Sequence, residues 1–383
     1  MTVAWFDQSN LADLVVSENE FSKKAARYFE PFIRNGVRNY VANIDSELAL
    51  VQVDDLVFPV TVNSREYENS YVVSPYTQYV SYAYEELSKL RQPRLEALLR
   101  PVIRLLGALL KVGSVNRVVI VNNWLFSTNL YPAVSSHQIG QVVGFLQSRF
   151  PRHAIVFRSV YLNEEGSASP WQPARLIFSR QVYFWKQTLP SKDLIRDFKV
   201  LNRLTHESER LSDVHGIIDP QVYDRVTELY RSLYIQKYSK LNPQYSSQFW
   251  MHALESGALA IEVLKDCSVS AGDPGAIQGF CTFFDVGQTT SSPAIGYDCA
   301  QPQKMGLYRM VEALSFRRAI SREARMNLSA GAPQFKRARG GVPKVEYMAV
   351  FSQHLGLRRR APWWLLQKIA NGLALKLVQE NEL

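Results

Sequence analysis

The sequence has few cysteines, and their positions suggest no covalent or metal framework. Cys267, Cys281 and Cys299 are the only three in 383 residues. Their spacing matches neither a zinc site nor a set of disulfides, so we predict no metal and a reducing compartment. The first residues show no basic segment followed by an apolar one, which is the pattern of a secretory signal. We therefore expect a cytoplasmic protein.

Long uninterrupted apolar runs are also missing. The most apolar stretch, residues 95–110, contains Arg100, Pro101 and Arg104. It is too interrupted to cross a bilayer, and we expect a core helix that bends or restarts at Pro101. The mean hydropathy of −0.16 likewise argues against an integral membrane protein. We predict no transmembrane segment.

The composition is that of a globular protein with a basic excess. The chain is 46% hydrophobic and 21% charged, which excludes disorder and collagen-like structure. Its length suits two or three domains. The net charge of +9 favours acidic partners: nucleic acid, phosphate-bearing cofactors, acidic carrier proteins or anionic lipid. Residues 301–344 hold ten basic and two acidic residues, which could form one patch beside a donor cleft.

Strand-like and helix-like segments alternate in the first half. Asp54-Asp55 separates two apolar segments and predicts a hairpin. Ser136 is a plausible helix cap, and residues 163–173 have loop composition. We expect strands at 48–53, 56–62, 71–80, 117–121, 154–160 and 174–185, and helices at 83–90 and 135–149.

A second unit begins near residue 188. Asp219-Pro220 marks a helix start, because proline suits the first helical position. We expect strands at 259–264, 277–284, 294–299, 325–328 and 345–351, and helices at 191–210, 306–323 and 363–378. The fold class predicted is α/β, with two related units, 1–187 and 188–383. Each has a mixed, mainly antiparallel sheet flanked by helices.

The most distinctive sequence segment is Asn327-Leu-Ser-Ala-Gly-Ala-Pro-Gln-Phe-Lys-Arg-Ala-Arg-Gly-Gly341. It is followed by Glu346-Tyr-Met-Ala-Val-Phe351 and His354-Leu355. A strand, a Gly-containing turn, Phe-Lys-x-x-x-Gly and a final strand resemble the carboxy-terminal part of the GNAT acyltransferase superfamily. The FemAB-like branch, whose members carry two GNAT-like units in one chain, is the most similar. Residues 233–244, and the pair 296–298 and 306–309, are similar to the same branch. The resemblance covers about residues 190–355.

The resemblance implies a site for the phosphates of an acyl donor. GNAT enzymes hold the coenzyme A pyrophosphate on an Arg/Gln-x-x-Gly-x-Gly/Ala loop before the central helix. The matching segment of this sequence is Gln303-Lys-Met-Gly306-Leu-Tyr308, in which Tyr308 replaces the second small residue of the loop. A helix amino-terminus can still receive a phosphate. The departure leaves room for an acyl group on a carrier protein or on tRNA. The donor-binding residues implied are Gln303, Lys304, Met305, Gly306, Leu307 and Lys336.

The catalytic candidates are a carboxylate or a histidine that could deprotonate an amine. Asp298 lies at the end of the strand that would line the donor cleft, and it could instead cap the following loop; both readings stay open. Glu346 could bind or deprotonate the acceptor, although pairing with Lys336 or Arg339 is favoured. His354, after the last strand, is a third candidate.

Two tyrosines and the carboxy-terminal segment carry weaker alternatives. Tyr308 and Tyr347 could protonate a leaving thiolate, but most tyrosines are packing residues. Arg358-Arg-Arg360 precedes Trp363-Trp364 and a helix. That helix either docks its apolar face on the body, which is favoured, or lies at an interface near lipid or a long acyl chain.

The function predicted is an N-acyltransferase. It would move an acyl group, with a chain longer than acetyl favoured, from coenzyme A or an acidic acyl carrier protein to a primary amine of a small molecule or peptide. One alternative is a Fem-type aminoacyltransferase, for which aminoacyl-tRNA is the only nucleic acid partner considered. Another is a non-catalytic GNAT-fold protein that presents a basic surface. An enzyme should have a channel between two splayed strands near Asp298.

Overall fold

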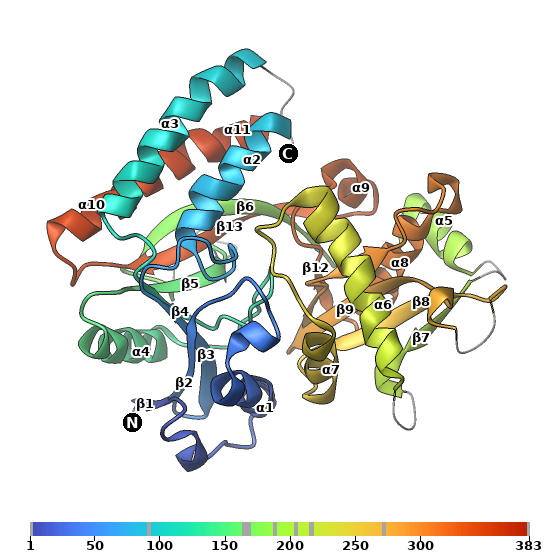
Figure 1. The fold of residues 1–383 in the computed structure, drawn as a ribbon, viewed down its shortest axis with the longest axis horizontal. Helices are drawn as coiled ribbons and strands as arrows, with labels where there is room; N and C mark the ends of the chain where they lie inside the picture. The colour runs from blue at the N-terminus through green and yellow to red at the C-terminus, as the bar shows by residue number, and fades with distance from the viewer. Residues whose placement is uncertain are drawn as a thin grey trace. The chain divides into compact units, whose positions relative to one another are not determined.

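The computed structural model describes residues 3–89, 93–162, 170–186, 190–202, 206–213, 218–269 and 273–380 (Figure 1). The chain forms two compact units. Unit 1 comprises Met1–Arg180, Leu241–Pro243 and Val345–Glu382, and unit 2 comprises Gln181–Lys240 and Gln244–Lys344. The predicted boundary at 187/188 lies outside the described residues. The chain passes into unit 2 seven residues earlier and returns to unit 1 at Val345, so the last strand and helices do not belong to the second unit.

Unit 1 is built on a mixed sheet with the strand order β1-β2-β3-β4-β5-β13-β6. Strands β4 and β5 run parallel, whereas β1–β2, β2–β3, β3–β4 and β5–β13 are antiparallel. The strands are β1 (Val3–Phe6), β2 (Glu47–Val53), β3 (Leu56–Asn63), β4 (Val118–Val121), β5 (Ala154–Val160), β6 (Arg175–Trp185) and β13 (Val342–Phe351). The helices are α1 (Glu20–Asn35), α2 (Tyr82–Lys89), α3 (Pro93–Val112), α4 (Ser136–Arg149), α10 (Leu357–Ile369) and α11 (Leu375–Glu380).

Side chains that alternate along the central strands of unit 1 form its core. Ile120, Val156 and Val350 pack in one cluster with Leu110 of α3 and Trp363 of α10. The docking of α10 on this cluster is the arrangement that the sequence favours for the last helix. The apolar spacing of α10 therefore serves core packing on that side.

Unit 2 has the strand order β6-β12-β10-β9-β8-β7, with β11 paired to β9. Strands β10 and β12 run parallel, and β6–β12, β9–β10, β8–β9, β7–β8 and β9–β11 are antiparallel. The strands are β7 (His206–Arg210), β8 (Ala260–Asp266), β9 (Ile277–Val286), β10 (Thr289–Ser291), β11 (Ile295–Tyr297) and β12 (Arg325–Asn327). The helices are α5 (Lys192–Leu201), α6 (Pro220–Tyr230), α7 (Ser247–Glu255), α8 (Leu307–Ser321) and α9 (Pro333–Ala338).

Strand β9 separates two helical layers in unit 2. Cys281 and Phe283 pack against α8 and α5, and the alternate residue Phe280 contacts Trp250 of α7 at 5.6 Å between ring centroids. Gly296 on β11 allows close approach of α6, because an added Cβ would lie 3.1 Å from the backbone of Leu229.

The two units repeat one element order. Unit 1 contains β1, α1, β2, β3, β4, α4 and β5, and unit 2 contains β7, α6, β8, β9, β10, α8 and β12. In both, the last two strands of the series form the parallel pair. The second residue beyond each pair is a serine with a left-handed backbone, Ser159 (φ 56°) and Ser329 (φ 59°). This repeat confirms the predicted tandem α/β fold with mainly antiparallel sheets.

Three local predictions are wrong. Residues 71–80 form no strand but turn into a π-helical segment, Thr77–Ser81, that continues into α2. The helix predicted over 191–210 ends at Leu201, and His206–Arg210 is strand β7 because its backbone pairs with that of β8. The helix cap is Ser135 instead of Ser136.

Helix α3 runs through Pro101 as one helix. Proline removes one helical hydrogen bond but does not interrupt this helix. Within the described residues, no helix is both long enough and apolar enough to cross a membrane. The predicted loop 163–173 lies mostly outside those residues.

Candidate functional site

Unit 2 has an open strand edge where its parallel pair separates. Strand β10 lies between β9 and β12, but after Ser291 the chain continues as β11, which pairs with β9 alone among the described strands. The hydrogen bonds from Thr282 N–H to Ala294 O (3.0 Å) and from Asp298 N–H to Gln278 O (2.8 Å) show which residues of β11 turn their backbone groups towards β9. The N–H groups of Ile295 and Tyr297 therefore point away from β9. They are backbone donors available to a ligand.

A second set of backbone donors lies at the start of α8. Gln303–Met305 form a 3₁₀ turn, and Gly306 follows with φ 76° before the helix begins at Leu307. No side chain caps this helix, and the first helical bond inside α8 is Met310 N–H to Gly306 O, 3.0 Å. Lys304 and Gln303 are exposed. The predicted donor-loop residues thus form a turn directly before α8. The N–H groups of Met305 and Gly306 are bonded inside this turn, to the carbonyls of Pro302 and Gln303, whereas the first N–H groups of the uncapped helix suit an anion.

The equivalent helix of unit 1 has no such opening. The Oγ of Ser135 accepts from the N–H of Gln138 (3.2 Å), and the Gln138 side chain accepts from the N–H of Ser135 (3.0 Å). This capping box satisfies the helix start with side chains of the protein itself. The two repeats therefore differ at this position, because side chains cap the start of α4 and no side chain caps the start of α8.

Asp298 follows directly after the open edge. Its Oδ2 lies 3.2 Å from Nη2 of Arg225, and its Oδ1 accepts from the N–H of Ala300 at 2.9 Å. These contacts hold the turn between β11 and the Gln303 loop. They match the loop-capping interpretation, and the ion pair with Arg225 fixes the orientation of the carboxylate.

A buried ion-pair cluster joins α8 to α5. Asp197 of α5 is fully buried and accepts from Nε of Arg309 (2.6 Å) and Nε of Arg339 (2.5 Å). Burial raises the pKa of Glu312 on α8, although the charge of Lys336 acts to lower it. Burial likewise raises the pKa of Tyr308, which makes it a poor acid for a leaving thiolate. Arg309 and Arg339 are thus used in holding α5, α8 and α9 together.

Lys336 is not on the surface. It is 3% exposed, and its Nζ donates to the carbonyls of Ser329 (3.2 Å) and Ala330 (2.7 Å). Those carbonyls belong to the loop after β12. The contacts give Lys336 a positioning role in that loop, whereas the resemblance implied donor binding.

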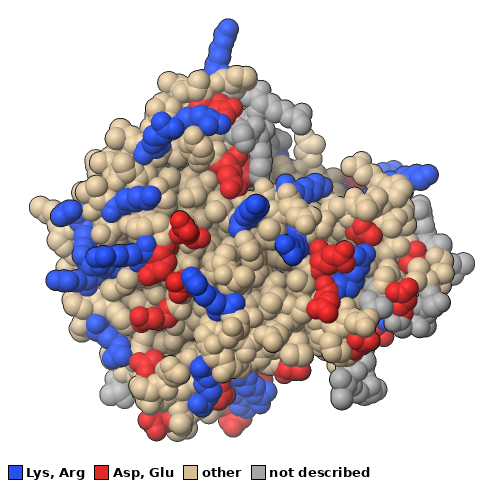
Figure 2. All heavy atoms as spheres, in the orientation of Figure 1, with Lys and Arg blue, Asp and Glu red and all other residues tan. Residues whose placement is uncertain are grey.

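The basic excess of residues 301–344 does not form a single positive patch. Arg309 and Arg339 pair with Asp197, Arg317 pairs with Glu262, and Arg318 and Arg322 pair with Asp285. On the face of unit 2 seen in Figure 2, Lys and Arg atoms alternate with Asp and Glu atoms. The charge count from the sequence missed these acidic partners because they come from α5, β8 and β9, which are distant in the chain.

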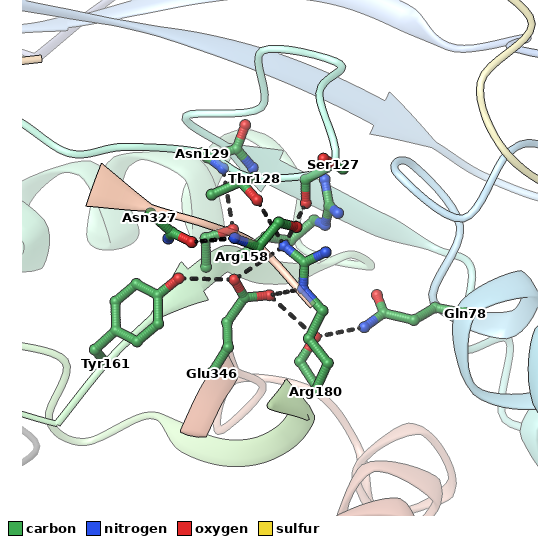
Figure 3. A network of polar contacts seen from close by, with 12 residues as sticks. Gln78, Ser127, Thr128, Asn129, Arg158, Tyr161, Arg180, Asn327 and Glu346 are labelled. Carbon is green, nitrogen blue, oxygen red and sulfur yellow. Dashed lines mark hydrogen bonds and ion pairs between the residues drawn. The ribbon is translucent and has the colours of Figure 1, made fainter. Parts of the chain in front are cut away.

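Glu346 lies in unit 1, where it forms the centre of a polar network (Figure 3). It is 2% exposed and accepts from Nε (2.9 Å) and Nη2 (3.1 Å) of Arg180. The hydroxyl of Tyr161 donates to its Oε2 at 2.8 Å. Nη2 of Arg180 also donates to the carbonyl of Ser127 and to Oγ1 of Thr128, each at 2.8 Å. Glu346 does pair with an arginine, but with Arg180 instead of the expected Lys336 or Arg339.

Arg158 joins this network from β5. It is 5% exposed, and its Nη1 donates to the carbonyls of Val72 (3.1 Å) and Phe126 (3.3 Å). Burial lowers its pKa, although Tyr71 and Glu346 oppose the effect. Arg158 thus links β5 to the buried segment that follows β4. Its side chain lies at the end of the parallel pair of strands in unit 1.

His354 and Tyr347 also belong to unit 1. Nε2 of His354 lies 2.9 Å from the carbonyl of His153, so this nitrogen carries the proton, and burial lowers the pKa of the ring. Tyr347 lies on β13, and burial raises its pKa. The three catalytic candidates are therefore divided between the units, Asp298 in unit 2 and Glu346 and His354 in unit 1.

In the described part of the chain, the three cysteines differ in burial and no cluster of metal-ligating residues occurs. No group of three or more His, Cys, Asp and Glu residues there could hold a metal ion. Burial raises the pKa of Cys281 to about 12, so this thiol stays protonated at neutral pH. Cys267 and Cys299 are exposed and free.

The sequence predicts an opening between two strands near Asp298, but it does not identify the N–H groups of Ile295 and Tyr297, because backbone donors carry no residue signature. Sequence reasoning also missed Arg158 and Arg180. Each is a charge inside a largely apolar strand, 154–160 and 175–185, and that interruption was the available signal.

No family model matches the chain, and no curated protein matches it. Among solved structures, it is similar to a tandem GNAT protein from the clavulanic acid biosynthesis pathway, with 7% identity over 91% of this chain and 98% of that chain and a TM-score of 0.40. It is also similar to FemX, with 6% identity over 61% and 79% and a TM-score of 0.41.

A third neighbour is L-PGS from Bacillus licheniformis, with 12% identity over 60% of this chain and 77% of that chain and a TM-score of 0.43. At 6–12% sequence identity, these likenesses are of fold and not of function.

Proposed function

We propose that the protein is an acyltransferase that transfers an acyl group from a thioester donor to a primary amine, with the donor bound by unit 2. The observation that carries the proposal is the difference between the two repeats. The start of α4 is closed by its own capping box, whereas the start of α8 and the neighbouring edge of β11 keep unsatisfied N–H groups.

The backbone donors suit the two parts of such a donor. A phosphate-bearing arm would bind the N–H groups at the start of α8, with Lys304 adding charge. The thioester carbonyl would accept from the N–H of Tyr297 or Ile295, which stabilises the oxyanion formed when an amine attacks. The amine attacks the thioester carbon, the C–S bond breaks, and the thiolate leaves with the proton that the amine loses. No covalent enzyme intermediate is needed.

Asp298 is the carboxylate next to this edge, and we assign it to proton removal from the attacking ammonium. The ammonium has no lone pair, and an alkyl amine with a pKa near 10.4 is mostly protonated at neutral pH. Arg225 orients the carboxylate through their ion pair.

Donor binding tests the proposal without knowledge of the acceptor. Acetyl-CoA, a long-chain acyl-CoA and an acylated carrier protein would be titrated into the full chain by calorimetry. Lys304→Glu should weaken binding of the preferred donor by about 1–3 kcal/mol. Lys192→Glu is the matched control. Lys192 is exposed at the first residue of α5, and it is the opposite end of that helix, at Val200, that lies next to Gly306. Equal affinity of wild type and Lys304→Glu would remove the α8 turn from the site.

A Fem-type reaction is the second candidate, and the replacement of a small residue by Tyr308 favours it, since a bulky side chain there disfavours a tightly held coenzyme A. The donor would then be aminoacyl-tRNA. Its affinity should fall steeply with salt, because many phosphates would be neutralised, whereas acyl-CoA affinity should fall only slightly. A steep salt dependence with tRNA, and no heat with either thioester, would select this candidate.

A further inference from the structure

Helix α3 exposes a continuous apolar stripe. Leu98, Val102, Leu105, Leu109 and Val112 recur at alternating spacings of four and three residues, which places them on one side of the helix. They are between 42% and 66% exposed. Single exposed aliphatic residues are normal on a protein surface, but five in one row are not.

The stripe is not the core face of the helix. Ile103, Leu106 and Leu110 already pack into the unit 1 core. The carboxyl end of α3 is held against α10, since a Cβ on Gly113 would lie 2.1 Å from Cγ of Pro362. A surface helix normally needs one apolar side, so the second side calls for a separate explanation.

Basic residues accompany the stripe. Arg94, Arg104 and Lys111 of α3 are exposed, and the sequences of α3 and α10 together contain eight Lys and Arg against one Glu. That glutamate, Glu96, pairs with Arg100. The neighbouring α2 adds Glu85 and Glu86, which leaves the group strongly positive. Figure 1 shows α3 and α10 side by side within unit 1.

The outer side of α10 and the segment after it has the same chemistry. Its exposed apolar residues are Leu357, Trp364 and Leu373, and its exposed basic residues include Arg358 and Lys368. The Nζ of Lys368 lies 6.0 Å from the ring centroid of Trp364. Tryptophan beside lysine is typical of side chains at a membrane–water interface.

We propose that α3, with the adjoining outer side of α10, binds the surface of an anionic lipid bilayer. The apolar stripe would enter the boundary between headgroups and acyl chains, and the Lys and Arg side chains would meet the lipid phosphates. A second copy of the chain is the less suitable occupant, because it would bring the same positive charges to the interface.

Vesicle sedimentation with the full chain tests this proposal. Wild type should sediment with vesicles of phosphatidylcholine mixed with phosphatidylglycerol, and much less with phosphatidylcholine alone. Leu98→Gln/Leu105→Gln should weaken the binding at least ~10-fold, because two leucines lose their transfer out of water. Arg94→Gln/Arg358→Gln should weaken it about 10-fold on the anionic vesicles.

Ile195→Gln/Ile320→Gln is the matched control, because these aliphatic residues are 42% and 43% exposed on helices of unit 2. It should bind vesicles as wild type does, and all variants should keep the wild-type circular dichroism spectrum. No binding by wild type, or full binding by the α3 leucine variant, would overturn the proposal. Sedimentation velocity gives the other decisive result: a wild-type dimer that Leu98→Gln/Leu105→Gln dissociates would identify a second copy as the occupant.

Discussion

Replacing Glu346 with glutamine should destabilise unit 1. The carboxylate is 2% exposed and receives two bonds from Arg180 and one from Tyr161. Glutamine keeps the shape but removes the charge, and its amide NH₂ would face a donor. Loss of one partner of a buried ion pair costs about 3–5 kcal/mol. The Arg180 side chain is 22% exposed, so solvent recovers part of this, and we expect a loss of about 2–4 kcal/mol.

The assay is urea unfolding followed by circular dichroism and tryptophan fluorescence, with the transitions of the two units fitted separately. Glu30→Gln is the control, since its pair with Arg34 is exposed on α1 and should contribute at most about 0.5 kcal/mol. In a double-mutant cycle, Glu346→Gln/Arg180→Gln should be less destabilised than the sum of the two single variants.

An unfolding free energy of Glu346→Gln equal to that of wild type would refute this reasoning. If such a variant had also lost acyl transfer, the catalytic role considered from the sequence would be the better account. Loss of stability with normal turnover in the folded fraction would assign Glu346 to the structure alone.

Three further predictions concern single side chains. Asp298→Asn should lower kcat by about 10²–10⁴-fold at neutral pH, with partial recovery at higher pH, and unchanged turnover would leave Asp298 as a loop residue only. Asp197→Asn should lower the unfolding free energy of unit 2 by about 3–5 kcal/mol in urea titrations, because Arg309 and Arg339 lose their shared carboxylate. Burial lowers the pKa of His153 in the folded protein to about 4, whereas the unfolded chain has the ordinary histidine pKa near ~6.5. Above pH ~6.5 the ring is neutral in both the folded and the unfolded protein. As the pH falls towards 4 the unfolded chain is protonated first, so the free energy of unfolding declines, by about 1–2 kcal/mol after allowance for partial exposure. His153→Gln should flatten this pH profile, and an equally steep profile in that variant would contradict the assignment.

Local pattern was enough to predict most of the fold. The hairpin at Asp54 and the long helix after Gly306 follow from spacing and turn residues that act within a few positions. Residues 71–80 misled because aromatic and β-branched residues favour strands, yet here their side chains pack against a helix and against the core. The return of residues 345–382 to unit 1 depends on pairing between β13 and β5, which no local pattern reports.

The candidate site could be predicted only in part. The Gln303–Leu307 turn was visible because Gln303-Lys-Met-Gly306 resembles the Arg/Gln-x-x-Gly part of the GNAT loop before a helix, and Gly306 has the positive φ that glycine favours. The partners of Asp298, Lys336 and Glu346 were not visible. Each is held by a residue or a carbonyl from another element, and the sequence gives no distance between them.

The difference between the repeats leads to a last prediction, on stoichiometry. Both units place a helix start and a parallel strand pair in the same order, so either could have held a donor. In unit 1 the capping box of Ser135 and Gln138 occupies the helix start, and Arg158 ties the segment after β4 into the core. Filling that end of the sheet with the protein's own polar groups leaves nothing for a ligand to satisfy. Calorimetric titration should therefore give a single donor per chain, with an affinity weakened by about 1–3 kcal/mol in Lys304→Glu and unchanged in Ser135→Ala. Two equivalent donors per chain, or an affinity that is unchanged in Lys304→Glu and weakened in Ser135→Ala, would refute the assignment of the donor to unit 2 alone.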